Sequence, residues 1–117
     1  MTFLFRRGSE NAAFQNLDLK QYRAKYVNPG IDHTLVDVRT VEEYKQGHMP
    51  GAINIPLDQL AAKIGKVPRD KPVVVVCATG NRSRGGSKAF VTAGYEAVFN
   101  LKGGTMAWRM QKLPIDY

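Results

Sequence analysis

The sequence has very little cysteine: Cys77 is the only one in 117 residues. A single cysteine cannot form a disulfide within the chain or a cysteine-rich metal site, so both kinds of cross-link are excluded. The N-terminal stretch from Met1 to Arg7 has an apolar segment that is far too short for a signal peptide or a membrane span. We therefore expect a soluble, cytoplasmic protein with a reduced thiol and no membrane partner.

A compact run of basic residues is missing as well, although the net charge is +7 and the isoelectric point is about 9.8. Lysines and arginines are spread from Arg6 to Lys112, and neither a zinc-finger spacing nor an aromatic RNA-recognition motif is present. The charge suits an anionic partner such as a small oxyanion or an acidic protein. Nucleic acid is not favoured as the main ligand, because charge alone is a weak signal of nucleic-acid binding.

What the sequence does contain is an alternation of strand-like and helix-like segments, which predicts an α/β domain with a largely parallel sheet. The length fits a single domain over residues 1–117, with residues 1–15 as a loosely packed N-terminal extension. Val73–Val76, four β-branched residues in a row, predicts a central strand covered on both faces. The other expected strands are 13–15, 34–38, 52–55 and 97–101, and the expected helices are 19–26, a short one between Thr40 and Gly47, 58–64, 83–93 and a last one that carries Trp108.

The residues that can do chemistry follow the central strand, in Cys77-Ala78-Thr79-Gly80-Asn81-Arg82-Ser83-Arg84. Ligands of open α/β sheets bind at the carboxyl ends of the strands, where a tight loop can turn several backbone N–H groups toward one anion. Gly80, and after it Asn81, tolerate the backbone conformations that such a loop needs. These N–H groups, the positive end of the following helix and the Arg82 guanidinium all favour a thiolate. We predict that Cys77 is a nucleophile that is substantially ionised at neutral pH.

Four pieces of the sequence, in order, resemble the rhodanese family from about Asn16 to the C-terminus. They are Leu35-Val36-Asp37-Val38-Arg39; Glu43-Tyr44 with Gly47-His48-Met49-Pro50-Gly51-Ala52-Ile53-Asn54-Ile55-Pro56; Val73-Val74-Val75-Val76-Cys77 with Gly80-Asn81-Arg82-Ser83; and Leu101-Lys102-Gly103-Gly104 with Trp108. Each piece is weak alone, but the ordered set at these spacings is highly specific. The resemblance implies a rhodanese-like α/β fold, with a mostly parallel sheet of about five strands flanked by helices on both faces.

The same resemblance implies a sulfurtransferase that needs no metal and no organic cofactor. Its thiolate attacks the sulfane sulfur of a small anionic donor such as thiosulfate or polysulfide, or of another persulfide. The cysteine persulfide then passes this sulfur to cyanide, a thiol or a protein. By this resemblance Cys77 is the catalytic residue, and Arg82 helps to hold the oxyanion of the donor. The expected substrate-binding cradle consists of Ala78, Thr79, Gly80, Asn81, Arg82 and Ser83.

Two other functions stay open at this point. The domain could be a persulfide carrier or protein-interaction module, for which transfer to a partner matters more than turnover of a small donor. A Cys-dependent phosphatase or arsenate reductase is less favoured, because phosphatases of this fold use a Cys-x5-Arg loop and Arg82 follows Cys77 in a Cys-x4-Arg spacing. The shorter loop suits a single sulfur atom better than a phosphate group, unless Arg84 bends back.

The remaining polar landmarks are expected to be structural. Asp37 and Arg39 are expected to bind each other and the backbone of nearby loops. His48 has no second ligand at a metal-binding spacing, so a hydrogen bond within its turn is expected, and His33 is expected to be solvated. Aromatic and methionine side chains on a terminal helix are usually buried, which predicts core positions for Trp108, Met106 and Met110.

Overall fold

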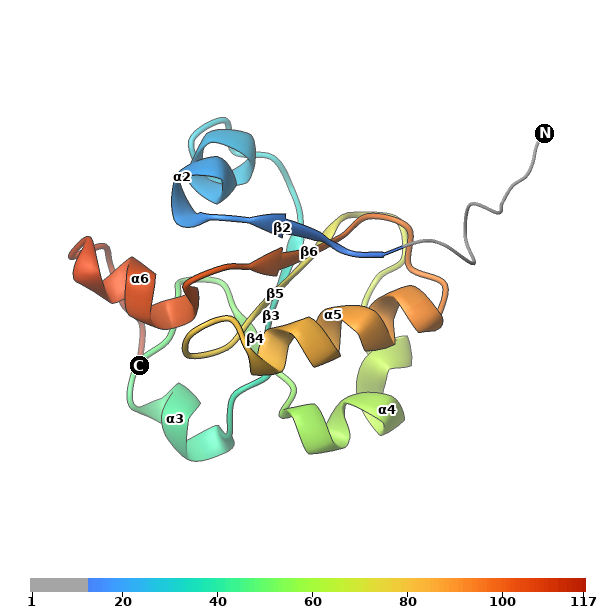
Figure 1. Ribbon diagram of the computed structural model, residues 1–117. Coiled ribbons are helices and arrows are strands. Elements are labelled where there is room, and N and C mark those ends of the chain that lie inside the picture. The colour runs from blue at the N-terminus through green and yellow to red at the C-terminus, as the bar shows by residue number, and fades with distance from the viewer. Residues whose placement is uncertain (1–12) are drawn as a thin grey trace.

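The computed structural model describes residues 13–117, which form an α/β domain around one parallel sheet (Figure 1). The predicted N-terminal extension lies mostly in residues 1–12, outside the described residues. The strand order is β2-β6-β5-β3-β4, and every neighbouring pair is parallel, which confirms the predicted fold class. The strands are β2 Gln15–Leu17, β3 Thr34–Asp37, β4 Ile53–Asn54, β5 Val73–Val76 and β6 Val98–Leu101.

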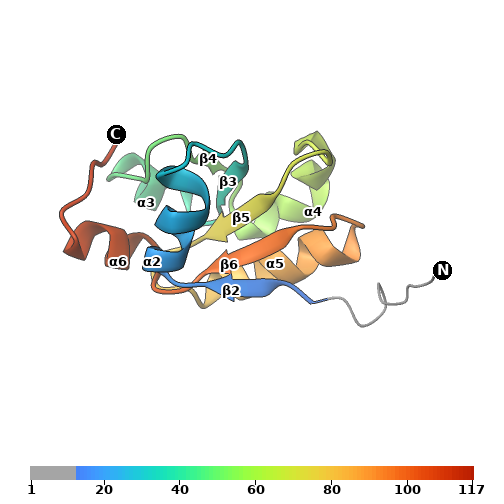
Figure 2. The same cartoon turned by 90° about the horizontal axis from the view of Figure 1, so that it is seen from above.

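Helices cover both faces of the sheet (Figures 1 and 2). The helices α4 and α5 pack on one face, and α2, η1 and α6 pack on the other. Over residues 13–117, no helix combines the length and the apolar character that crossing a bilayer requires. The helical segments are α2 Leu19–Tyr22, the π-helical η1 Arg23–Val27, α3 Val41–Lys45, the 3-10 segments η2 Leu57–Gln59 and η3 Ile64–Lys66, α4 Leu60–Lys63, α5 Arg82–Thr92 and α6 Gly104–Met110.

The central strand β5 forms where the sequence predicted it. All four of its valines are fully buried. Val74 and Val76 belong to the core cluster under α2 and α6, whereas Val73 and Val75 belong to the cluster under α4 and α5. A strand covered on both faces needs an apolar residue at every position, so an uninterrupted apolar run is enough to locate it.

Several predicted elements differ from the structure, among them the helix expected over 19–26, which continues from α2 as the π-helical η1, and distant residues act on two others. The first strand begins at Gln15 rather than residue 13, since its register is fixed by parallel pairing with β6. The helix expected over 58–64 is a series of short segments over 57–66. The Tyr95 hydroxyl binds its C-terminal end, because it donates to the Ile64 carbonyl at 2.8 Å and to the Val67 carbonyl at 2.6 Å.

Capping boxes start two of the helices. The Gln21 N–H donates to Asp18 Oδ1 at 2.8 Å, and the Gln21 side chain accepts from the Asp18 N–H at 2.9 Å. The Thr40 hydroxyl accepts from the Glu43 N–H at 3.2 Å, and Glu43 Oε1 accepts from the Thr40 N–H at 3.0 Å. The second box, with a Thr-x-x-Glu spacing, also holds the Glu43 carboxylate in a fixed orientation.

The terminal helix α6 is only partly in the core. Trp108 is buried, as predicted, and its indole N–H donates to the Pro114 carbonyl at 2.6 Å. The prediction was wrong for the two methionines, because Met106 is 53% exposed and Met110 is 74% exposed. A helix that packs with one face buries only the residues of that face, and these methionines lie outside it.

The N-terminus of α6 is bound to the loop that follows β5. The Thr105 N–H donates to the Cys77 carbonyl at 2.9 Å, and the Met106 N–H donates to the Ala78 carbonyl at 3.0 Å. Gly104 has a φ of +59°, and a Cβ on it would overlap both carbonyl oxygens. Only glycine therefore lets α6 come close enough to make these hydrogen bonds.

Substitution of three glycines by alanine tests this close approach. Gly104→Ala is expected to lower the free energy of unfolding by about 2–4 kcal/mol. Two costs add up: alanine is strained in a left-handed backbone conformation, and its Cβ overlaps the two carbonyl oxygens. Gly30 has a φ of +71° but open space around it, so Gly30→Ala is expected to lose only about 1–2 kcal/mol. Gly65→Ala, with neither constraint, is the control and is expected to change stability by less than about 1 kcal/mol.

The measurement is denaturant unfolding followed by the fluorescence of Trp108, the only tryptophan of the chain. Equal losses for Gly104→Ala and Gly30→Ala would contradict the close approach of α6.

Candidate active site

Cys77 lies directly after β5, where the chain turns toward α5, and only 1% of the residue is exposed. The Gly80 N–H donates to its Sγ over 3.1 Å, and Sγ lies 3.3 Å from Ser83 Oγ, to which the thiol can donate. The sulfur is therefore enclosed by the loop and by the first turn of α5. The N-terminus of an 11-residue helix faces this region, and its dipole favours negative charge there.

Two opposing effects act on the pKa of Cys77. Burial raises it, because a charged sulfur loses its hydration. Hydrogen bonds from the Ser83 hydroxyl and from the backbone N–H groups of Ser83, Gly80 and Thr79 lower it, and together they outweigh burial. The net direction is a pKa below the ordinary value of a cysteine thiol, in the direction that the sequence predicted.

The loop conformation depends on one glycine. Gly80 has a φ of +103°, which other residues rarely adopt, as its expected role in the loop requires, and it packs against the backbone of Gly103. Asn81, in contrast, has a φ of −82° in the right-handed region, because it leads directly into α5. The outer side of the loop lines a polar cavity of about 320 Å³, formed by Asn16, Thr79, Gly80, Asn81, Arg84, Asn100, Lys102 and Gly103.

The Arg82 side chain is engaged by a carboxylate from another element. Its two terminal nitrogens donate to the two Glu43 carboxylate oxygens at 2.7 and 2.9 Å, a bidentate pair between α5 and α3. Hydrogen bonds from Arg82 lower the pKa of Glu43 to about 2, and those to Glu43 raise the pKa of Arg82. Arg82 is thus neutralised beside the loop, and its predicted contact with a donor oxyanion stays a prediction.

The buried pair of Asp37 and Arg39 supports the neighbouring strand end, as expected. Arg39 binds both carboxylate oxygens of Asp37, and its Nη2 also donates to the Gly47 carbonyl at 2.9 Å. His48 makes the expected structural hydrogen bond: its Nδ1 lies 2.9 Å from the Tyr44 carbonyl, and the two rings stack. These contacts join the end of β3 to α3 and hence fix the position of Glu43.

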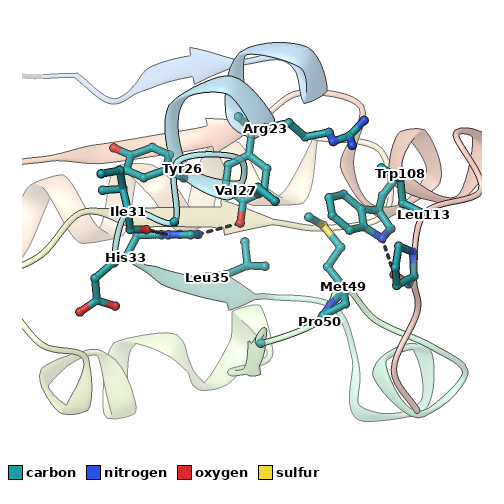
Figure 3. Close-up of a pocket in the computed structure, with 15 residues that line it drawn as sticks. Arg23, Tyr26, Val27, Ile31, His33, Leu35, Met49, Pro50, Trp108 and Leu113 are labelled. Atoms are coloured by element: carbon teal, nitrogen blue, oxygen red, sulfur yellow. Dashed lines mark hydrogen bonds between the residues drawn. The ribbon is translucent and has the colours of Figure 1, made fainter.

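A larger cavity, of about 600 Å³, lies on the α2 face of the sheet, and Cys77 does not line it (Figure 3). It is bordered by η1, the segment that leads into β3, Met49, and Trp108 of α6. His33 lines it and is half-buried, so the expectation that this side chain is solvated is met only in part. His33 Nε2 lies 2.7 Å from the Tyr22 hydroxyl and Nδ1 lies 2.8 Å from the Ile31 carbonyl, because η1 folds over it.

Asn100 is a residue of the site that sequence reasoning missed. It lies on β6, is 1% exposed, and accepts a hydrogen bond from the Ser83 hydroxyl. The only signal was one amide in an otherwise apolar predicted strand. Over residues 13–117, no three His, Cys, Asp or Glu side chains gather as metal ligands.

Comparison with known proteins agrees with this geometry. The profile of the family described as "Rhodanese-like domain" matches residues 18–111. A protein of Allochromatium vinosum named "Sulfurtransferase" is 38% identical over 84 residues, which are 72% of this chain and 78% of the relative.

Solved structures give the same result. A rhodanese-related protein from Thermoplasma volcanium superposes with a TM-score of 0.77 at 27% identity, over 88% of this chain and 98% of that one. A thiosulfate sulfurtransferase from Pseudomonas aeruginosa gives a TM-score of 0.74 at 26% identity, over 89% of this chain but only 20% of that one.

The pair of Glu43 and Arg82 predicts a pH-dependent contribution to stability. Because the pKa of Glu43 falls to about 2 on folding, its charge stabilises the fold above the ordinary pKa of a glutamate, and the effect is lost as the pH falls toward 2. Glu43→Gln, which keeps the capping box, is expected to cost less than about 1 kcal/mol at neutral pH, because the pair is partly exposed.

Denaturant unfolding at a series of pH values measures this contribution, with Glu42→Gln in the same helical turn as the control. The difference between wild type and Glu43→Gln is expected to shrink as the pH is lowered from 5 toward 2. A difference independent of pH would contradict the ion pair.

Proposed function

The chain belongs to the family of rhodanese-like domains, and from this membership we propose that it moves a sulfane sulfur through a persulfide on Cys77. The family and the relative named a sulfurtransferase support a role of the sulfurtransferase type. The observation that carries the proposal is the position of Cys77, with its sulfur enclosed by N–H donors at the carboxyl edge of the sheet.

The proposed reaction consists of two displacements. The Cys77 thiolate attacks the outer sulfur of the donor, a new S–S bond forms, and the donor's S–S bond breaks with its electron pair on the leaving group. That group is sulfite when the donor is thiosulfate, and a thiolate when the donor is a persulfide. A nucleophilic acceptor, such as cyanide or a thiolate, then attacks the outer sulfur, and Cys77 leaves as a thiolate.

The loop supports both displacements in the same way. The N–H groups that lower the pKa of Cys77 favour the thiolate before the first step and again after the second. In a persulfide the outer sulfur lies about 2 Å from Sγ. An acceptor therefore needs to reach this outer atom and not the buried Sγ of Cys77 itself. A good leaving group in each step removes the need for a strong general acid.

The charge of the site bears on the choice of donor. Arg82 is neutralised by Glu43, and the loop mouth therefore has less positive charge than the sequence alone implies. A dianion such as thiosulfate gains little from a neutralised guanidinium, whereas a persulfide of a thiol or a protein does not depend on it. Thiosulfate is therefore proposed as a donor that the domain accepts, and a persulfide as the donor that its charges fit better.

The first test is intact-mass spectrometry of the reduced protein after incubation with thiosulfate, and separately with a thiol persulfide. A gain of one sulfur, about 32 Da, on the wild type is expected, and the matched Cys77→Ser variant is expected to gain nothing. Because Cys77 is the only cysteine, a sulfur atom added to a thiol of this chain is on Cys77. Absence of the gain with both donors, on a thiol that iodoacetamide alkylates, would overturn the proposal.

The neutralised guanidinium gives a second prediction. Glu43→Gln keeps the hydrogen bond to Thr40 but removes the negative charge, so it is expected to raise kcat/KM for thiosulfate about two- to fivefold. Turnover with an uncharged persulfide donor is expected to change less. Glu42→Gln controls for net charge, and an equal increase in this variant would assign the effect to the overall charge of the protein rather than to Arg82.

A further inference from the structure

Asn100 connects the Cys77 site to the edge of the sheet. Its Oδ1 accepts from the Ser83 hydroxyl, and its Nδ2 donates to Asn16 Oδ1 at 3.0 Å and to the Gly80 carbonyl at 3.4 Å. A backbone carbonyl can only accept a hydrogen bond, so the amide nitrogen of Asn100 must face Gly80. The amide oxygen must then face Ser83, which fixes the orientation of this side chain.

The Ser83 hydroxyl has one proton, and two neighbouring atoms can accept it. While Cys77 is a thiol, every donor has an acceptor: the S–H donates to Ser83 Oγ, and the Ser83 hydroxyl donates to Asn100. Once the thiol proton has left to solvent, the sulfur can only accept. Ser83 then stabilises the sulfur only by turning its proton away from Asn100, which leaves a buried amide oxygen without a donor.

We propose that Asn100 is a positioning residue that competes with the Cys77 sulfur for the Ser83 proton and thereby opposes ionisation of the thiol. The inference rests on the proposed role of Cys77 as the nucleophile. The backbone N–H groups of the loop stabilise the thiolate independently of this competition, and Asn100 limits what the Ser83 hydroxyl adds. With Asn100 in place, the Cys77 thiol stays protonated up to a higher pH than it would if Ser83 could donate freely to the sulfur.

The charged groups on the elements packed around the Cys77 loop are separate from this competition. They are Arg82 and Arg84 of α5, Glu43 of α3, Asp37 and Arg39 at the end of β3, and Lys102 after β6. The elements β2 and β6 contribute the neutral amides of Asn16 and Asn100, and α6 contributes backbone N–H groups. Substitution of Ser83 or Asn100 by a neutral residue leaves every one of these charges in place. A change in the pKa of Cys77 therefore reports on hydrogen bonding.

The test is the pH dependence of alkylation by iodoacetamide, read by intact mass on the folded full-length protein. Asn100→Leu, of similar volume, frees the Ser83 proton and is expected to lower the pKa of Cys77 by roughly one pH unit. At a pH below both pKa values, alkylation is expected to be about threefold faster, because the larger thiolate fraction is partly offset by weaker nucleophilicity. No sulfur donor is needed, so the result does not depend on sulfurtransferase activity.

A double-mutant cycle with Ser83→Ala separates the competition from a general disturbance of the loop. In the Ser83→Ala background, Asn100→Leu is expected to leave the pKa nearly unchanged, because no hydroxyl proton remains to be freed. The matched control is Ser87→Ala, one turn later on α5, where a fully buried hydroxyl has no hydrogen-bond partner among residues 13–117. This variant is expected to keep the wild-type pKa.

The pKa of Cys77 in these variants either supports or overturns the competition. An unchanged or higher pKa in Asn100→Leu, or an equal decrease with and without Ser83, would overturn the proposal. If Asn100→Leu does not fold, Ser83→Ala alone decides: the proposal expects a rise in the pKa of less than about half a pH unit, because Asn100 already holds the proton. A rise of about one unit or more would show that the hydroxyl donates freely to the sulfur and that Asn100 does not compete.

Discussion

The geometry around Cys77 depends on the contact between the N-terminus of α6 and the carbonyls of Cys77 and Ala78. These carbonyls accept hydrogen bonds from Thr105 and Met106, so the peptide groups of the loop turn their oxygens toward α6. The Ala78 carbonyl shares its peptide group with the Thr79 N–H, which is one of the donors that lower the pKa of Cys77, and the Gly80 N–H that follows donates to the sulfur. The contact requires Gly104, because any Cβ at this position would overlap the two carbonyl oxygens. A helix distant in sequence therefore orients the dipoles on which the proposed chemistry depends.

Two of the cationic side chains near the sulfur, Arg82 and Arg39, are paired with carboxylates, whereas Arg84 and Lys102 border the polar cavity. Glu43 binds Arg82 with two hydrogen bonds, and Asp37 binds Arg39 in the buried end of β3. With Arg82 and Arg39 compensated, the Ser83 hydroxyl and the backbone N–H groups of the loop are the hydrogen-bond donors that lower the pKa of Cys77, and the helix dipole favours a thiolate as well. Such support acts over a short range and suits one sulfur atom. This arrangement is consistent with sulfur transfer. It gives little support to a reaction in which the Arg82 guanidinium has to bind an oxyanion, because Glu43 already occupies that guanidinium.

The two faces of the sheet differ in what they offer a ligand. Cys77 belongs to the cluster under α4 and α5, next to a polar cavity that Arg84 and Lys102 border. The larger and more apolar cavity, beside His33 and Trp108, lies on the opposite face. The polar network from Ser83 through Asn100 to Asn16 crosses from the sulfur to the edge strand β2. The larger cavity is therefore separate from Cys77, and the smaller polar cavity is the one that shares the loop and Asn100 with the proposed nucleophile.

The sequence by itself determined the features that depend on neighbouring residues: the valine strand, the capping boxes, the positive φ of Gly80 and the place of Cys77 after a buried strand. Each follows from local sterics, local hydrogen bonds or a short apolar run. Only the tertiary structure decided the partners of these residues. Glu43 meets Arg82 across 39 positions, Ser83 meets Asn100 across 17, and the positions of His33 and Met106 depend on which helix covers which face. A polar side chain can bind many partners of the right chemistry, and packing of the sheet and its helices selects the one that lies within reach.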